Sequence, residues 1–308
     1  MMKRTPRKKD PWAELVTESP NPHSRDLDLM KPTEIVRLIA AEDARAVARI
    51  AESADTIAAV ARDFANAIVS GGRVVYIGAG TSGRLGVIDA AELVPTFGLP
   101  RKGPGSAMGL IAGGPAALRR SIEGAEDDAA RGRAEIDALK LRGNDLVIGI
   151  SASSMAPYVR GALAAAHARK SSTALVTMNI IPRPRYVDHL IAVPVGPEVL
   201  AGSTRMKSGL TTKSILHSIS TTAMVIAGKV YGNRMVDLKT WCAKLDARAN
   251  RLMIDIGGVS RKEALLIRKE ARDDIKLALV MARTGLSRKD SRARLKNAGG
   301  NLRAALES

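Results

Sequence analysis

An α/β fold built on a five-stranded, parallel, doubly wound sheet is predicted by three features of the sequence. Five short apolar runs alternate with helical stretches, which is typical of a parallel sheet covered by helices on both faces. The chain is 45% hydrophobic but only 3% aromatic, so Ala, Val, Ile and Leu must form most of the core, as suits helices packed on such a sheet. Its 308 residues allow one large domain and a small second one.

The expected strands are short apolar runs, and the first of them ends in a glycine turn. This run follows Gly71-Gly72 and ends at Gly78, the pattern of a strand that enters a tight turn. The five expected strands are Arg73–Gly78, Met108–Gly114, Asp145–Ser151, Thr173–Asn179 and His189–Val195.

The remaining elements are predicted to be helices, because their apolar residues recur at helical spacing. Two helices are expected within Thr33–Ser70, and a long helical stretch over Lys207–Leu252. Pro115–Ala138 and Pro157–Ala168 each begin with a proline, which the first turn of a helix tolerates. After Gly257-Gly258, three short amphipathic helices are expected to form a small bundle. These are Arg261–Glu270, Asp274–Thr284 and Ser287–Asn297.

Charge and composition divide the chain into a basic tail or extended arm (1–28), a large α/β domain with flanking helices (29–255) and a small helical domain (256–308). Much of the formal net charge of +17 lies in Lys3–Lys9 and Arg261–Arg303. We interpret these stretches as a solvated tail and a solvated helical face, because no nucleic-acid-binding motif accompanies them. The scarcity of aromatic side chains also argues against single-stranded nucleic acid as a partner.

Several other classes of function are also disfavoured by composition. Cys242 is the single cysteine, so the chain can form neither an internal disulfide nor a cysteine-based zinc site. The four histidines show no metal-ligand spacing, so no metal is expected. No apolar run reaches the roughly 18 residues of a membrane-spanning helix, and no apolar signal-peptide core follows the basic N-terminus. We therefore expect a cytoplasmic protein with no membrane contact.

The turn GAGTSGR, from Gly78 to Arg84, has the composition of an anion-binding loop between a strand and a helix. Gly80 lets the backbone approach a ligand closely, and Thr81 and Ser82 offer hydroxyl donors at the N-terminus of the helix. A purely structural turn is the alternative. The glycines also fit GxGxxG spacing, but no ribose-binding acid is evident after the next strand, so dinucleotide binding is disfavoured. No GK[ST] sequence follows, which excludes a Walker loop.

Two further turns before expected helices are rich in hydroxyl groups. The first turn is Gly149–Val159 and the second is Gly196–Gly209. For each turn taken alone, the alternative is that its hydroxyl groups cap the following helix and bind no ligand. Because three such turns occur in one predicted sheet, we expect them to converge on a single anion site. The residues that they would contribute are Ser151, Ser153 and Ser154 from the first and Ser203, Thr204 and Lys207 from the second.

Two carboxylates follow strands at their expected carboxyl ends, where α/β proteins gather their sites. Glu92 lies in IDAAELVPTFG, and Glu126 lies in EGAEDD. Acid–base chemistry on a sugar requires two positioned carboxyl groups, one protonated and one ionised. Spacing alone leaves open that either residue is an ordinary solvated side chain on a helix.

Several long motifs together resemble the N-acetylmuramic acid 6-phosphate etherase family. They are GGRVVYIGAGTSGRLGVIDAAELVPTFG, IAGG, EGAEDD, VGPEVLAGSTRMKSG and GKVYGNRMVD, and the similarity runs from about Thr17 to the C-terminus. The resemblance implies a sugar isomerase (SIS) fold, a homodimer, no cofactor, and cleavage of the lactyl ether of a phosphorylated amino sugar. It places the family's catalytic glutamates at Glu92 and Glu126, and a ubiquitin-associated-like helical bundle after Gly257.

One loop departs from the family pattern. The family usually has ASGRTPYV where this chain has Ala152–Val159, so Ser154, Met155 and Ala156 replace a glycine, an arginine and a threonine. Two other functions therefore stay open: a non-catalytic hexose-phosphate regulator of the glucokinase regulatory protein type, and a sugar-phosphate isomerase. Glu92 favours the etherase over the regulator, because a regulator has no need of an acid at that position.

Overall fold

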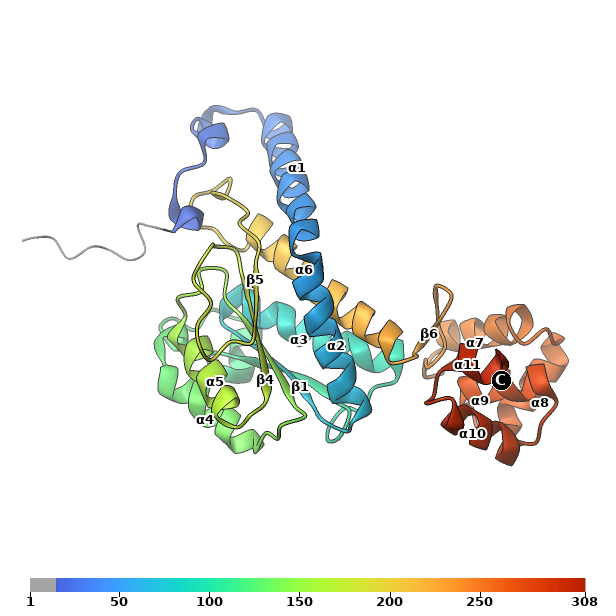
Figure 1. Cartoon of the computed structure of the whole chain (residues 1–308). Coiled ribbons are helices and arrows are strands. Elements are labelled where there is room, and N and C mark those ends of the chain that lie inside the picture. The colour runs from blue at the N-terminus through green and yellow to red at the C-terminus, as the bar shows by residue number, and fades with distance from the viewer. Residues whose placement is uncertain (1–14, 308) are drawn as a thin grey trace, which may run out of the picture.

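The parallel sheet predicted from the sequence is present in the computed structural model, which describes residues 15–307. Its five strands run parallel in the order β2-β1-β3-β4-β5 (Figure 1). Chain order and sheet order differ, since β2 and β3 lie on opposite sides of β1. The strands are β1 (Val74–Gly78), β2 (Ala107–Ile111), β3 (Leu146–Ile150), β4 (Ser172–Thr177) and β5 (His189–Ala192).

Helices cover both faces of this sheet, which confirms the predicted α/β class. On one face lie α2 (Ala54–Val69), α3 (Gly80–Phe97) and α6 (Lys207–Ile226). On the other lie α4 (Ala129–Leu139) and α5 (Pro157–Ala168).

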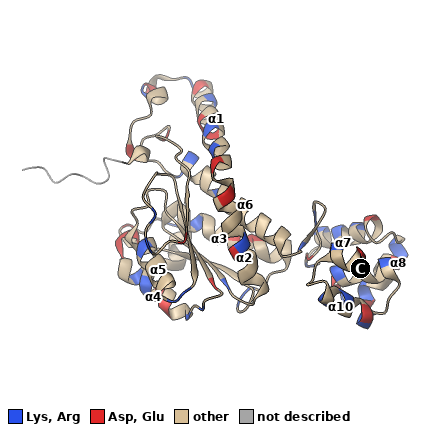
Figure 2. Ribbon diagram, in the orientation of Figure 1, with Lys and Arg blue, Asp and Glu red and all other residues tan. Residues whose placement is uncertain are grey.

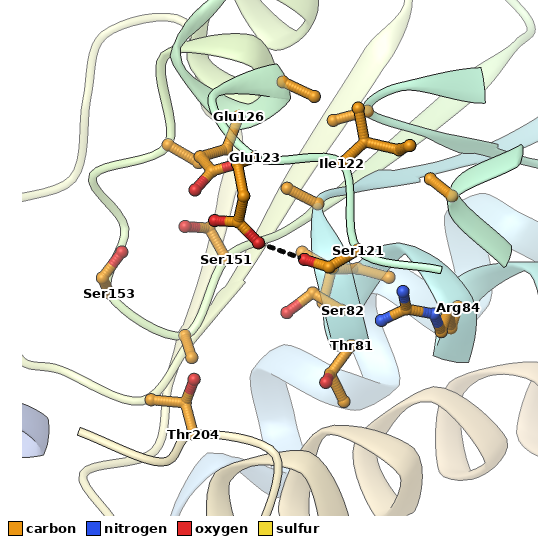
Figure 3. Close-up of a pocket in the computed structure, with 18 of the residues that line it drawn as sticks. Thr81, Ser82, Arg84, Ser121, Ile122, Glu123, Glu126, Ser151, Ser153 and Thr204 are labelled. Carbon is orange, nitrogen blue, oxygen red and sulfur yellow. Dashed lines mark hydrogen bonds between the residues drawn. The ribbon is translucent and has the colours of Figure 1, made fainter. Parts of the chain in front are cut away.

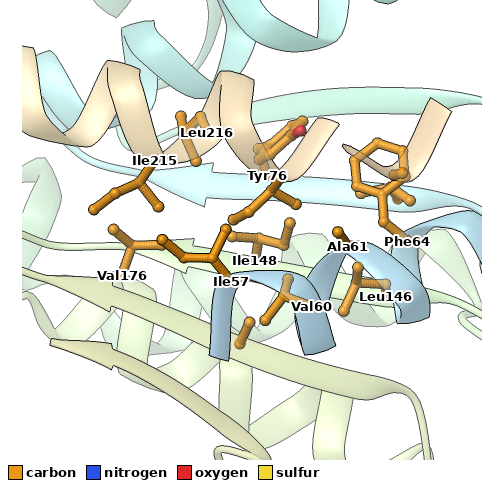
Figure 4. Packing of buried hydrophobic residues seen from close by; sticks show 14 of the residues in the cluster. Ile57, Val60, Ala61, Phe64, Tyr76, Leu146, Ile148, Val176, Ile215 and Leu216 are labelled. Carbon is orange, nitrogen blue, oxygen red and sulfur yellow. The ribbon is translucent and has the colours of Figure 1, made fainter. Parts of the chain in front are cut away.

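Side chains of β1 alternate between the two helical layers, as the pleat of a strand requires. Tyr76 packs in the cluster with α2, α3 and α6, whereas Val75 and Ile77 pack with α4 and α5. Figure 4 shows the first cluster, in which the rings of Phe64 and Tyr76 lie 6.3 Å apart between centroids. The buried Tyr76 hydroxyl donates a hydrogen bond to Asp89 of α3 at 2.8 Å, so the core contains no unpaired phenol there.

The helix predicted over Pro115–Ala138 is wrong in its first half. The chain instead forms two 3₁₀ turns, η5 (Gly114–Leu118) and η6 (Ala125–Asp127), before α4 begins at Ala129. Gly113 and Gly124 adopt the left-handed conformation just before these turns, with φ values of 84° and 73°, and this conformation cannot continue a helix. The irregular segment lies past the carboxyl end of β2 and carries Glu126.

The single helical stretch predicted over Lys207–Leu252 is also wrong. It contains α6, a short hairpin of β6 (Val230–Tyr231) and β7 (Arg234–Met235), and then α7 (Ala243–Asp255). Gly228 and Gly232 have φ values of 68° and 59°, so each supplies a left-handed residue that ends α6 or turns the hairpin.

The C-terminal helices share an apolar cluster of their own. The three predicted helices are present, and a fourth short one follows: α8 (Arg261–Glu270), α9 (Ile275–Thr284), α10 (Arg288–Asn297) and α11 (Leu302–Glu307). Residues of α7 join the same cluster, although they precede position 256; a domain boundary at 256 stays a prediction. Figure 2 shows Lys and Arg on these helices, and Lys289, Arg292 and Lys296 of α10 are exposed.

The N-terminal part of the described chain packs on the α/β domain. Residues 1–14 of the predicted basic tail lie outside the described residues, but the segment from 15 to 24 forms an arm that is anchored by four buried residues: Leu15, Thr17, Asn21 and Ser24. Its Thr17 carbonyl accepts a hydrogen bond from the Gly202 amide at 3.2 Å, and the Ser24 hydroxyl donates to the Val199 carbonyl at 2.7 Å.

Three more 3₁₀ turns and one helix complete this N-terminal region. They are η1 (Val16–Glu18), η2 (Pro22–Ser24), η3 (Leu27–Leu29) and α1 (Pro32–Ala48); the turn η4 (Arg49–Ser53) then joins α1 to α2. Within positions 15–307, none of the helices combines the length and the apolar character needed to cross a bilayer.

A buried carboxylate, Glu42 of α1, links the arm, α1 and α6. Lys207 Nζ lies 2.6 Å from its Oε2, and Asn21 of the arm donates to the same oxygen at 3.1 Å. His23 and Arg45 contact its other oxygen. Burial by itself would raise the pKa of Glu42, but the hydrogen bonds from Lys207, Arg45, His23 and Asn21 outweigh burial and lower the pKa to about 2.

Replacing Glu42 is expected to destabilise the fold because it leaves the Lys207 ammonium buried without its carboxylate. Glu42→Gln should lower the free energy of unfolding at pH 7 by about 3 kcal/mol, measured by urea denaturation. The exposed pair Arg49–Glu52 supplies the control, and Glu52→Gln should cost less than about 1 kcal/mol.

The difference in the free energy of unfolding between the wild type and Glu42→Gln should become smaller at acidic pH. Glu42 has a lower pKa in the folded chain than its ordinary value of 4.5, so its contribution is present above pH 4.5 and is lost as the pH falls toward 2. The gap between wild type and Glu42→Gln should therefore narrow over that range. A gap that stays constant or widens would show that the Glu42 charge is not the source of the stability.

Candidate functional site

A pocket of about 280 Å³ opens at the carboxyl edge of the sheet, where β1 and β3 end side by side. The chain crosses from β1 to β2 on one side and returns to β3 on the other, and such switch points form the usual ligand crevice of open α/β sheets. The lining residues are Glu18, Ala79, Gly80, Thr81, Ser82, Arg84, Ala112, Ala117, Ser121, Ile122, Glu123, Ala125, Glu126, Ile150, Ser151, Ala152, Ser153, Ala156 and Thr204. Figure 3 shows most of them.

The turn after β1 brings the N-terminus of α3 to this pocket. A Cβ atom at Gly78 would lie 2.7 Å from the Gly83 nitrogen, and one at Gly83 would lie 2.6 Å from the Gly78 oxygen, so only glycine allows α3 to approach β1 so closely. Gly80, Thr81 and Ser82 then line the pocket at the first turn of the helix. Free backbone N–H groups and the helix dipole favour an anion at such a place.

The turn after β3 faces the same pocket, so the structure brings Ser82 and Ser153 to one cavity. Ser151 and Ser153 line it, whereas Ser154 does not. The turn is anchored at Ala152, whose carbonyl accepts hydrogen bonds from Asn179 Nδ2 at 2.9 Å and from the Thr177 hydroxyl at 3.1 Å. The Ser153 hydroxyl accepts the Met155 amide at 3.1 Å and keeps its own proton available for a ligand.

The third hydroxyl-rich turn contributes less than the sequence predicts. Of its three candidate residues only Thr204 lines the pocket; Ser203 does not, and Lys207 is buried against Glu42. The Glu198 carboxylate accepts hydrogen bonds from the backbone amides of Lys207 at 3.1 Å and Ser208 at 2.9 Å. The N-terminus of α6 therefore already holds a carboxylate of the chain itself.

The two candidate carboxylates are not brought together within one chain. Glu126 lines the pocket from η6, and Figure 3 shows its side chain beside that of Glu123. Glu92 is exposed on α3 and lies outside the residues that line the pocket. It lies ten positions after Ser82 on the same helix, a rise of about 15 Å along the axis.

Four polar residues of the pocket were not predicted as site residues: Glu18, Arg84, Ser121 and Glu123. Arg84 ends the glycine-rich motif, so its position directly after a loop of the phosphate-binding type could have identified it as a site residue. Ser121 and Glu123 lie in the segment wrongly predicted as helix, and the Ser121 hydroxyl donates to Glu123 (Figure 3). No sequence pattern around Glu18 indicates a site residue, because only packing of the N-terminal arm against Gly202 brings Glu18 to the pocket.

Comparison with known proteins identifies the family of this chain. The chain is 44% identical over 294 residues to the N-acetylmuramic acid 6-phosphate etherase of Cronobacter sakazakii, covering 95% of this chain and 98% of that protein. The etherase of Salmonella agona matches with the same identity and coverage. The chain belongs to the N-acetylmuramic acid 6-phosphate etherase family.

Two further similarities cover parts of this etherase-family chain. Residues 53–167 match the family model of the glucokinase regulatory protein N-terminal SIS domain. Among solved structures, the sugar isomerase domain of the RpiR transcription factor from Sphaerobacter thermophilus aligns with a TM-score of 0.45 at 17% identity, covering 63% of this chain and 91% of that one.

In this etherase-family chain, Ser154 stands where the family motif has glycine, and its backbone adopts a conformation that favours glycine. Its φ is 63°, in the left-handed region that glycine adopts without strain and other residues rarely occupy. Its hydroxyl donates to the Ser153 carbonyl, which helps to hold the turn. The loop therefore keeps the backbone conformation of a glycine turn while it presents Met155 and Ala156 in place of an arginine and a threonine.

Substitutions at Ser154 should separate the backbone effect from the hydroxyl. Ser154→Gly and Ser154→Ala both remove the hydroxyl, but only alanine keeps a Cβ in the left-handed conformation. We expect Ser154→Gly to be more stable than Ser154→Ala by about 1 kcal/mol in urea denaturation. Equal stabilities would contradict a strained left-handed residue at this position.

Proposed function

We propose that this protein cleaves the D-lactyl ether of N-acetylmuramic acid 6-phosphate, giving N-acetylglucosamine 6-phosphate and D-lactate in the recycling of cell-wall sugars. The observation that carries this proposal is the 44% identity to proteins of that name over nearly their whole length. The pocket supports it, because it combines hydroxyl donors at a helix N-terminus with the Glu126 carboxylate. We place the reaction in the cytoplasm.

The phosphate is proposed to bind between the turns after β1 and β3. Gly80, Thr81 and Ser82 offer backbone and hydroxyl donors at the start of α3, and Ser151 and Ser153 offer hydroxyls from the opposite turn. Thr204 adds a hydroxyl from a third segment. Such donors suit a phosphate oxygen, and the helix dipole favours its charge.

The proposed chemistry is an elimination followed by hydration. Ring opening exposes the aldehyde, which acidifies the proton at C2. Glu126 removes that proton, and Glu92 protonates the ether oxygen as its bond to C3 breaks, so that D-lactate leaves. Water then adds across the C2=C3 bond, with its oxygen at C3 and its proton at C2. No electrons are exchanged with an external acceptor, so the overall reaction requires only the substrate and one water.

Because Glu92 is exposed and lies along α3 from its own pocket, we propose that it serves the pocket of a second copy in a homodimer. Ile88 precedes it by one helical turn on the same face of α3, and Ile88 is 48% exposed. An exposed apolar residue beside an exposed acid is consistent with a face that a second copy covers. The family resemblance assigns the two glutamates their roles.

A hexose-phosphate regulator is the second candidate, favoured by the match of residues 53–167 to the regulatory protein domain. A regulator of this kind would bind sugar phosphates without releasing D-lactate. The presence of Glu126 in the pocket and the near full-length similarity to etherases favour the enzyme.

The decisive assay is incubation of the protein with N-acetylmuramic acid 6-phosphate and measurement of D-lactate. Glu126→Gln should abolish both lactate release and exchange of the C2 proton with solvent deuterium, whereas Glu92→Gln should block release but permit exchange. Each loss should be about 10²–10⁴-fold. The opposite exchange pattern would reverse the two roles, and no lactate from the wild-type protein would remove the etherase proposal.

Mixed dimers test whether Glu92 acts on the partner's pocket. When Glu92→Gln and Glu126→Gln chains are refolded together, random pairing makes about half of the dimers mixed, and each mixed dimer would hold one intact pocket. We expect about a quarter of wild-type lactate release from the mixture and almost none from either variant alone. No recovery in verified mixed dimers would place both glutamates in pockets of a single chain.

A further inference from the structure

Arg84 is the one cationic side chain among the pocket-lining residues in positions 15–307. The same pocket presents three carboxylates, those of Glu18, Glu123 and Glu126. Arg84 forms no ion pair with any carboxylate in the described part of the chain; its Nη2 donates to the carbonyl of Arg120 at 3.2 Å. A guanidinium has five N–H donors, so most of its capacity remains for a ligand.

The position of Arg84 on its helix increases its tendency to bind an anion. It lies near the N-terminus of α3, whose first turn contains no acidic residue. A cation at this end of a helix is disfavoured by the helix dipole, and a ligand anion offsets that cost. The side chain is only partly exposed, so water screens the interaction less than on an open surface.

The substrate class of the proposed function carries two anionic groups, a phosphate and the carboxylate of the lactyl ether. The hydroxyl donors of the turns after β1 and β3 suit the phosphate. In Figure 3 Arg84 lies on the Ser121 side of the pocket, and Ser153 lies on the opposite side. The guanidinium therefore lies on one side of the pocket, beside Thr81 and Ser82 of α3 and apart from Ser153 of the turn after β3.

We propose that Arg84 binds the lactyl carboxylate of the substrate, an assignment that rests on the proposed function. A guanidinium matches a carboxylate with two parallel hydrogen bonds, which fixes the orientation of the group as well as its charge. Held in this way, the lactyl group is positioned for its bond to C3 to break. The same contact distinguishes the ether substrate from the product sugar, which keeps the phosphate but has no carboxylate.

The test compares two ligands that differ in the lactyl group. Dissociation constants are measured by calorimetry for N-acetylglucosamine 6-phosphate with the wild-type protein and Arg84→Gln. For N-acetylmuramic acid 6-phosphate they are measured in the Glu126→Gln background, with and without Arg84→Gln, so that turnover does not interfere. We expect Arg84→Gln to weaken binding of the muramic acid ligand by about 10- to 100-fold and to change that of the other ligand by less than about 2-fold.

Two variants serve as controls. Arg119→Gln removes an exposed arginine that precedes Arg120 and does not line the pocket, and it should leave both constants unchanged. Arg84→Lys keeps the charge but loses the paired geometry, and should weaken only the muramic acid ligand, to a smaller extent than Arg84→Gln. A thermal melt close to that of the wild type establishes that each variant is folded.

Two of the remaining outcomes overturn the assignment, and a third separates it from the proposed function. Equal weakening of both ligands would mean that Arg84 binds the phosphate or shapes the whole pocket, and no weakening of either would mean that it binds neither anion. Selective weakening together with no lactate release by the wild type would refute the etherase proposal while keeping Arg84 as the carboxylate-binding residue.

Discussion

The close contact between β1 and α3 at Gly78 and Gly83 is the constraint on which the site depends. Each glycine lies so near the backbone of the other that a Cβ atom at either position would clash at less than 3 Å. The contact holds the first turn of α3 directly above the carboxyl end of β1, beside the end of β3. The free N–H groups of α3 and the turn Ser151–Ser153 consequently face one cavity.

The three hydroxyl-rich turns resemble one another in sequence but have different physical roles. Two of them leave their donors open to the pocket. In the third, the Glu198 carboxylate accepts hydrogen bonds from the backbone amides at the start of α6, and the Lys207 ammonium is paired with the buried Glu42 carboxylate. Charged groups buried in this way stabilise a particular packing of the N-terminal arm, α1 and α6, and they are unavailable for a ligand.

The altered loop and Arg84 bear on the same question of how an anionic sugar is held. Met155 and Ala156 provide neither the guanidinium nor the hydroxyl of the family motif, and Met155 does not line the pocket. The backbone conformation of the loop is nevertheless that of a glycine turn, at Ser154. Charge complementarity within the pocket of one chain then depends on Arg84, because the other charged side chains that line the pocket are the carboxylates of Glu18, Glu123 and Glu126.

The sequence by itself determined the strands of the sheet and the glycine turn after β1, because short apolar runs between helical stretches indicate buried strands and the glycines after the first run indicate a tight turn. It predicted the helices less well where left-handed glycines interrupt the helical spacing, as at Gly124 and Gly228. Only the tertiary structure decided which polar groups remain free. Lys207 meets a carboxylate 165 positions away, and Glu18 reaches the pocket because a distant turn at Gly202 holds the arm. Such pairings depend on residues far apart in the chain, and no local pattern records them.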